Sequence, residues 1–249
     1  MRLRILISAL LACASAPPIA QAASAPSPSA DEVIARMLAR DVQRETAAGG
    51  YTGIRQYVLE NPGFDKQARM LVSVTCGPDG EENFQVLSEQ GWKSATRFVL
   101  RKMLESESET SRPSVRPRTL IASENYAFQS IDVAPLDGRL AYRIAVIPKR
   151  KDEYLFRGRI WVDAEDYALA RVEGEPARNP SFWIRSVHFT QVYRKNGEYW
   201  FPCSTTSIAE ARAFGKTEVD IRYFDYLPRS AKADKHTNPE LVEARYVKR

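Results

Sequence analysis

Two histidines are the first residues to weigh for chemistry, because imidazole serves as a general base and as a metal ligand. His188 stands between Val187 and Phe189 in an alternating segment, and His236 lies near the carboxyl end of the chain. No second histidine, cysteine or carboxylate accompanies either one at a metal-ligand spacing, so no zinc or non-haem iron site is indicated. The G-x-S-x-G, H-E-x-x-H and phosphate-loop patterns are also missing from the sequence. We therefore expect no cofactor, no metal and no enzymatic activity.

Two runs of carboxylates are the next candidates for acid–base or calcium chemistry. The glutamates of Glu105–Glu109 alternate with serine, and Asp163–Asp166 contains three acidic residues. We interpret the first run as the solvated end of a helix and the second as a turn between strands. The twelve-residue calcium loop with its central glycine is not present.

Two cysteines, Cys76 and Cys203, remain when the N-terminal segment is set aside. In an oxidising compartment such a pair is a disulfide candidate, and closing so long a loop would contribute about 4–5 kcal/mol. The alternative is two separate buried thiols, and Cys76 does fall on the apolar phase of its segment. The sequence leaves both readings open.

The N-terminal segment is typical of an export signal. Arg2 and Arg4 precede the apolar run Ile5–Ala14, which is too short to span a bilayer, and Ala20–Ala22 supplies a cleavage pattern. We predict cleavage after Ala22 and a periplasmic location. A variant reading is lipidation at Cys13, because Leu10–Cys13 resembles a bacterial lipobox.

The composition is that of a globular protein: of 249 residues, 44% are apolar and 27% are charged. No later apolar run is long enough to span a bilayer. The formal charge of +5 comes from Arg2, Arg4 and the polar segment Pro228–Arg249, so residues 23–227 are formally neutral. This distribution gives no support to nucleic-acid binding.

Three helices are expected after the Ala23–Ser29 linker. A capping box at Ser29 opens the first one, which Gly49-Gly50 ends. Its apolar residues recur at helical spacing: Val33, Ile34, Met37, Leu38 and Val42. The second helix is predicted over Gly91–Ser108, and Ser123–Ser130 is interpreted as a short third one. The second helix places Trp92, Ala95, Val99 and Met103 on one face, which Phe98 and Leu100 widen.

The remaining segments alternate with a period of two and predict antiparallel strands. Met70–Cys76 and Asn83–Ser88 form a hairpin, and six further strands follow. These are Leu140–Pro148, Tyr154–Val162, Ala168–Gly174, Ile184–Arg194, Tyr199–Ala209 and Lys216–Leu227. In Tyr154–Val162 the apolar phase faces an interior, while Arg157, Arg159 and Trp161 face water.

The predicted fold is mainly β with an α lid: a curved antiparallel sheet, or unclosed β-barrel, with about three helices over a hydrophobic cavity. We expect a single domain over residues 30–227 and a flexible polar tail over residues 228–249.

Several stretches resemble those of a known family. They are Tyr154–Asp163, Asp166–Ala177, Trp183, the Asn196–Pro202 hairpin and Val219–Tyr223. Together they resemble bacterial outer-membrane lipoprotein-sorting proteins, the LolA/LolB-like superfamily, which includes RseB-like regulators of the envelope-stress anti-sigma factor. The resemblance covers the last two-fifths of the chain and implies an unclosed barrel around a cavity that accepts acyl chains.

The sequence thus favours a non-catalytic periplasmic carrier for a lipid or for the acyl chains of a lipoprotein, with a membrane-bound envelope protein as a further partner. The alternative is an RseB-like sensor that binds another envelope protein. The expected cavity lining is Trp92, Phe98 and Met103 from the lid, with Phe156, Ile160, Val162, Val219, Ile221 and Tyr223 from the sheet.

Overall fold

The computed structural model describes residues 27–179, 182, 184–212 and 215–231. The predicted signal segment with Ala22, the variant anchor Cys13, Trp183 and His236 lie outside the described residues, as does the predicted tail from residue 232 onward. In the part of the chain that is described, no helix is both long and apolar enough to cross a membrane.

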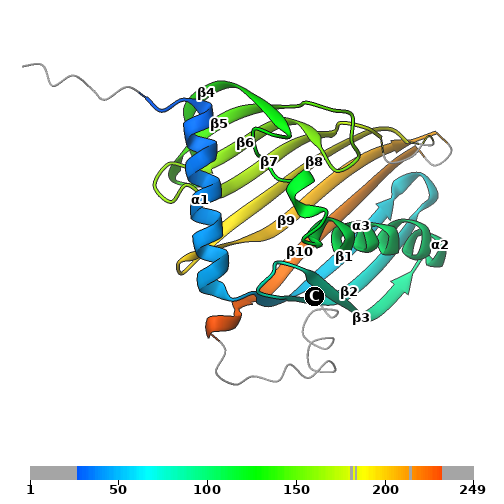
Figure 1. The fold of residues 1–249 in the computed structure, drawn as a ribbon. Helices are drawn as coiled ribbons and strands as arrows, with labels where there is room; N and C mark the ends of the chain where they lie inside the picture. The colour runs from blue at the N-terminus through cyan, green and yellow to red at the C-terminus, as the bar shows by residue number, and fades with distance from the viewer. Residues whose placement is uncertain (1–26, 180–181, 183, 213–214, 232–249) are drawn as a thin grey trace, which may run out of the picture.

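Ten antiparallel strands form one sheet in the spatial order β3-β2-β1-β10-β9-β8-β7-β6-β5-β4 (Figure 1). They are β1 (Tyr51–Asn61), β2 (Lys66–Cys76), β3 (Glu82–Gly91), β4 (Tyr126–Leu136), β5 (Arg139–Pro148), β6 (Phe156–Asp163), β7 (Leu169–Pro176), β8 (Ile184–Asn196), β9 (Tyr199–Ala211) and β10 (Gly215–Pro228). Because β3 and β4 are the two edges, the sheet is not closed into a barrel. The predicted fold class, mainly β with an unclosed antiparallel sheet and few helices, is confirmed.

Helix α1 (Ala30–Ala48) begins at the predicted capping box, in which the Ser29 hydroxyl accepts from the Glu32 amide and the Glu32 carboxylate accepts from the Ser29 amide. Its apolar stripe packs on strands β4 to β7. Val42 does not belong to that stripe and is 63% exposed, because Asp41 and Arg44 occupy the inward positions of its turn.

The second helical segment consists of α2 (Lys93–Ala95), a π-helical turn η2 (Thr96–Leu100) and α3 (Arg101–Ser111). It lies over the same face of the sheet as α1 but at the other end, near β1 to β3 (Figure 1). Regular helical spacing predicts Val99 inward, but Leu100 is fully buried and Val99 is exposed. The wider π turn holds an extra residue, which moves the inward position from 99 to 100.

The helices divide the inner face of the sheet into two apolar clusters. One lies beneath α1 and centres on Tyr126, Ile144, Ile160 and Val162. The other lies beneath the second helical segment and centres on Tyr57, Leu59, Met70, Val219 and Ile221.

The predicted helix over Ser123–Ser130 is wrong, because Tyr126–Leu136 forms the edge strand β4. Tyr126 and Phe128 alternate with Ala127 and pack together on the cluster beneath α1. A segment this short carries too few apolar residues to separate a period of two from a period of 3.6. The other described helical turns are the short 3-10 pieces η1 (Pro62–Phe64), η3 (Arg116–Arg118) and η4 (Arg229–Ala231).

Trp161 also differs from expectation. It stands on the outer face as predicted, but it is only 8% exposed because the Arg171 guanidinium lies 5.4 Å from its ring centroid. The aliphatic stem and planar head of arginine cover apolar surface while the charge stays near water.

Gly174 of β7 lies where two strands and a ring meet. A Cβ added there would stand 2.9 Å from Cδ2 of Phe156, and closer still to the backbone oxygen of Arg157. The Phe156 ring therefore covers the glycine, as aromatic side chains cover strand glycines in curved sheets.

We expect Gly174→Ala to lower the free energy of unfolding by about 1–3 kcal/mol, because a backbone atom and a core ring would have to move. Urea unfolding measures the change. Gly63→Ala is the matched control, since its nearest neighbour is Asn61 Oδ1 at 3.5 Å. Equal costs at the two sites would contradict this account.

Candidate functional site

Arg55, on β1, is a charged side chain buried beneath the second helical segment, with only 4% of its surface exposed. It forms an ion pair with Glu82 of β3 at 2.7 Å and a second with Glu107 of α3. Its Nε also donates to the Tyr226 hydroxyl of β10 at 2.6 Å. One guanidinium thus connects three strands or helices that are distant in sequence.

Aromatic rings enclose the same guanidinium. Its central carbon lies 5.0 Å from the Phe84 ring centroid, 5.4 Å from that of Tyr223 and 5.9 Å from that of Tyr226. Rings of this kind stabilise a desolvated cation, and arginine suits such a site better than lysine because it is planar and weakly hydrated.

The two carboxylates are held by tyrosines. The fully buried Tyr57 donates its hydroxyl to Glu107 at 3.0 Å, and Tyr51 donates to Glu82. We call Arg55, Glu82, Glu107, Tyr51, Tyr57 and Tyr226 the Arg55 cluster.

The cluster holds one positive group against two acidic ones. Burial alone would lower the pKa of Arg55, but Glu107, Tyr226 and Glu82 raise it well above its ordinary value. Burial raises the pKa of Glu107, and Glu82 acts in the same direction while Arg55 opposes them. The guanidinium therefore stays charged, and burial makes the ionised form of Glu107 less favourable than it is in water.

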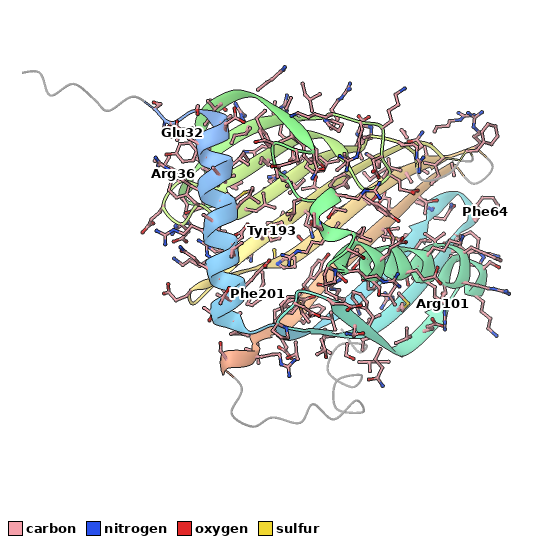
Figure 2. All side chains as sticks on the ribbon, viewed as in Figure 1. Glu32, Arg36, Phe64, Arg101, Tyr193 and Phe201 are labelled. Atoms are coloured by element: carbon pink, nitrogen blue, oxygen red, sulfur yellow. The ribbon has the colours of Figure 1, made fainter. Side chains whose placement is uncertain are left out.

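Beside the Arg55 cluster, aromatic rings continue across β10 and β9. The ring centroids of Tyr51 and Tyr226 are 5.4 Å apart, those of Phe201 and Tyr226 are 5.5 Å apart, and those of Tyr199 and Phe201 are 6.1 Å apart. We call these four residues with Tyr223 the aromatic strip. Figure 2 shows Phe201 of this strip, with Tyr193 of β8, in the region between α1 and α3.

Burial raises the pKa of Tyr193, and the charges of Tyr223 and of Asp41 in α1 raise it further. Burial raises the pKa of Asp41 to about 6; Glu45 adds to the rise, and Arg44, at 3.2 Å, opposes it. It is therefore a carboxyl that takes up a proton under mildly acidic conditions.

These groups make a binding surface more readily than a reactive one. His188 pairs with Glu175 at 3.2 Å, and both side chains are more than half exposed, at 62% and 57%. Burial raises the pKa of the Cys76 thiol to about 11, so this thiol is protonated at neutral pH. Among the described residues, no group of three histidines, cysteines or acidic residues could hold a metal ion.

The predicted lining residues fall into separate groups. Trp92, Met103, Val219, Ile221 and Tyr223 meet in the cluster under the second helical segment. The other three sheet residues, Phe156, Ile160 and Val162, lie under α1.

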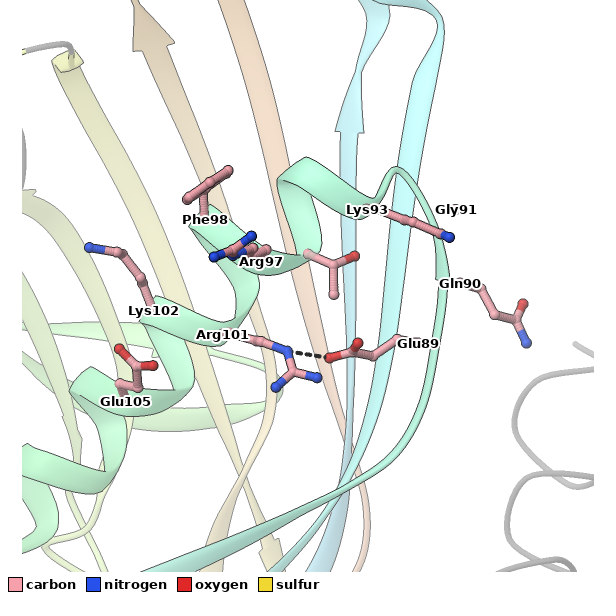
Figure 3. Close-up of a pocket in the computed structure, with 10 residues that line it drawn as sticks. Glu89, Gln90, Gly91, Lys93, Arg97, Phe98, Arg101, Lys102 and Glu105 are labelled. Atoms are coloured by element: carbon pink, nitrogen blue, oxygen red, sulfur yellow. Dashed lines mark ion pairs between the residues drawn. The ribbon is translucent and has the colours of Figure 1, made fainter.

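Phe98 faces away from both clusters and is 59% exposed. It lines a polar groove of about 660 Å³ between the end of β3 and the second helical segment (Figure 3). The groove therefore opens on the outer side of the lid.

The Arg55 cluster was missed by sequence reasoning. Arg55 shares the phase of Tyr57 and Leu59, and an arginine within an apolar phase is a signal of buried charge. The interpretation of Glu105–Glu109 as a solvated helix end is wrong for Glu107, which the Arg55 side chain draws under α3.

Of the two readings of Cys76 and Cys203, the structure shows two free thiols. Cys76 lies on β2 and Cys203 on β9, with β1 and β10 between them. Three strand spacings alone separate them by at least about 14 Å, well beyond the reach of a disulfide.

The fold and the site together define a class: an open antiparallel sheet whose inner face is covered by helices and carries a buried charge cluster. Residues 102–227 match a family of unknown function, DUF5686. The match spans just over half of the chain, and the chain belongs to this family.

The comparison with solved structures gives matches at low sequence identity. One is a domain described as an outer membrane lipoprotein-sorting protein, from Vibrio parahaemolyticus (12% identity, 84% of this chain and 97% of that chain, TM-score 0.39). A DUF1329 family protein from Desulfovibrio piger has 12% identity over 81% and 94% of the chains, with a TM-score of 0.42. A LolA superfamily protein from Nitrosomonas europaea has 9% identity over 82% and 96%, with a TM-score of 0.41. No curated protein matches the sequence.

The Arg55 cluster predicts a strong coupling between its members. We expect Arg55→Met to cost about 3–5 kcal/mol, because it leaves two carboxylates facing each other without a cation. Adding Glu107→Leu to Arg55→Met is expected to recover much of that loss. Urea unfolding of the single and double variants tests this, and purely additive costs would contradict the coupling.

Asp41 predicts a pH dependence. Because its pKa is raised from 3.8 to about 6, the folded state binds the proton more tightly than the unfolded state. Its contribution to stability is therefore full below about pH 4 and is lost as the pH rises through about 6. Asp41→Asn is expected to flatten the fall in unfolding free energy across this range, measured by urea unfolding at several pH values. An unchanged slope would show that other groups cause it.

Proposed function

We propose that the protein is a non-catalytic periplasmic binding protein that carries a lipid or the acyl chains of a lipoprotein. The observation that carries the proposal is the way α3 covers the inner face of the sheet. No residue of α3 is fully buried, although it lies over the apolar residues of β1, β2 and β10. The sheet residues beneath α3 form an apolar surface, whereas α3 itself contributes no fully buried side chain to it.

The contacts that hold α3 are mostly polar. Glu107 binds Arg55 and Tyr57, Glu109 accepts from Tyr154 at 3.1 Å, and Arg101 pairs with Glu89 at 2.8 Å. Polar contacts of this kind can be exchanged for contacts with water, whereas a buried apolar face cannot. The helix therefore serves as a lid that lifts to admit a ligand.

The uncovered surface suits an acyl chain. Leu59, Met70, Val219 and Ile221 form the apolar floor, and each methylene that leaves water there contributes about 0.8 kcal/mol. The aromatic strip next to it extends this floor with ring surface, for example where Phe201 meets Tyr226.

Two further features support the proposal. The N-terminal segment is typical of an export signal, which fits a periplasmic location. The named relatives of similar fold include a lipoprotein-sorting protein domain, and we extend that role to this chain as part of the proposal.

Native mass spectrometry of the protein purified from its own envelope, followed by extraction of bound lipid, tests the proposal. We expect acyl-bearing molecules in about equal amount to the protein. Ligand-free protein that also fails to bind a fluorescent fatty acid would overturn the carrier function. Recovery of a stoichiometric envelope protein instead would favour the sensor alternative.

Met103 provides a sharper prediction, because it is a half-buried lid residue packed on the floor. We expect Met103→Ser to weaken binding of a fluorescent fatty acid by about tenfold, the equivalent of losing one to two buried methylenes. Lys102→Ser, at an exposed position of the same helix, is the matched control and should leave the affinity unchanged. Equal effects would show that the chain does not lie under α3.

A further inference from the structure

We propose that the corner of the molecule formed by the β1–β2 turn and the start of the second helical segment docks on an anionic lipid bilayer. The corner contains Phe64 of η1, Lys66 of β2, Trp92, and Lys93, Arg97 and Phe98 of the helical segment. We call these six residues the basic–aromatic corner. The inference rests on this surface alone and does not depend on the ligand proposed above.

The corner exposes large apolar side chains to water. Phe64 is 50% exposed and Phe98 is 59% exposed, and Val99 next to it is 37% exposed. The Phe64 ring centroid lies 6.5 Å from that of Trp92, whose amide donates to the Gln67 carbonyl oxygen at 2.7 Å. The Phe64–Trp92 ring pair and the exposed Phe98 ring are the two parts of the apolar surface of this corner.

Each part of this apolar surface has a cation beside it. The Lys66 ammonium lies 5.6 Å from the Trp92 ring centroid, and the Arg97 guanidinium lies 5.3 Å from that of Phe98. Rings that enter the boundary between headgroups and acyl chains, with basic groups at the level of the phosphates, are the chemistry of interfacial membrane binding. A protein partner would not require this pairing of each ring with a cation.

Local charge selects an anionic surface. Lys66, Lys93, Arg97, Arg101 and Lys102 stand against Asp65, Glu89 and Glu105, and Glu89 is already paired with Arg101. Residues 23–227 hold 28 basic and 28 acidic residues, so this positive excess is local. Basic residues near an anionic leaflet each strengthen binding, and the effect falls with salt.

The groove beside the corner has room for a headgroup. It measures about 660 Å³, and Lys93, Arg97, Arg101 and Lys102 line it together with Phe98 (Figure 3). Figure 1 places the corner at the end of the sheet away from α1 and next to the lid. A molecule docked in this way would bring its lid to the bilayer surface.

Vesicle co-sedimentation tests the proposal. The protein is used in its mature form, isolated after the cell has processed it. The vesicles are phosphatidylcholine alone, or equal parts of phosphatidylcholine and phosphatidylglycerol. We expect binding to the anionic vesicles that weakens as salt is raised. We expect Lys93→Glu to weaken it at least fivefold and Phe64→Ser with Phe98→Ser to weaken it at least tenfold.

The controls carry the same changes elsewhere. Leu140→Ser alters an apolar side chain that is 60% exposed next to the other edge of the sheet, and Arg157→Glu alters an exposed cation on the outer face. Both should bind as the parent does. All variants change exposed residues, and thermal unfolding checks that each is folded.

Three results would overturn the inference. The protein does not bind anionic vesicles, or the corner variants and the controls lose binding equally. The third is that the parent protein binds an acidic peptide, and the corner variants lose this binding while they still bind the vesicles. Fatty-acid binding is read separately. Phe64→Ser with Phe98→Ser should keep it, so failure of the docking surface and failure of the carrier function are distinguishable.

Discussion

The desolvated guanidinium of Arg55 is the constraint around which the inner face is organised. A cation at that depth needs opposite charge, hydrogen-bond acceptors and polarizable rings together, and no single strand or helix supplies them all. Glu82 comes from β3, Glu107 from α3 and Tyr226 from β10. The position of α3 over the sheet is therefore fixed by charge at one end, more than by the apolar contacts along its length.

The two helical segments differ in how they are attached. Helix α1 has a complete cap and buries Val33, Ile34 and Met37 in the cluster beneath it, so it is part of the core. In contrast, α3 contributes half-buried residues and ionic contacts. Local stability follows the amount of buried apolar surface, so α1 is expected to stay in place while α3 opens.

Much of the fold follows from local pattern. The capping box at Ser29 and the alternating strands from β5 to β10 were predicted, because each depends on residues close in sequence. The edge strand β4 was not predicted, because a short apolar run fits two periods. The π turn was also missed, since it has no local signature, and Val99 and Phe98 were therefore placed on the apolar face along with Leu100.

The candidate site was harder to predict, for a physical reason. Arg55 and Glu107 are 52 residues apart, and nothing near either one shows that they meet. A glutamate run in water and a half-buried, ion-paired glutamate look the same in sequence, because the distant partner decides which one forms. Val219 and Ile221, in contrast, could be named from the alternation of β10, whereas Leu59 and Met70 beside them were not named.

The π turn also affects how the length of this helical segment can change over evolutionary time. Its extra residue is absorbed within Thr96–Leu100, because a π turn uses one more residue than an α-helix for about the same rotation. Removing one residue there would restore regular helical winding while Glu107 still faced Arg55. A deletion within α3 ahead of Glu107 has no such turn to absorb it, and it would rotate Glu107 by about 100° about the helix axis. The π turn is thus the part of the segment in which a change of length leaves the Arg55 cluster in place.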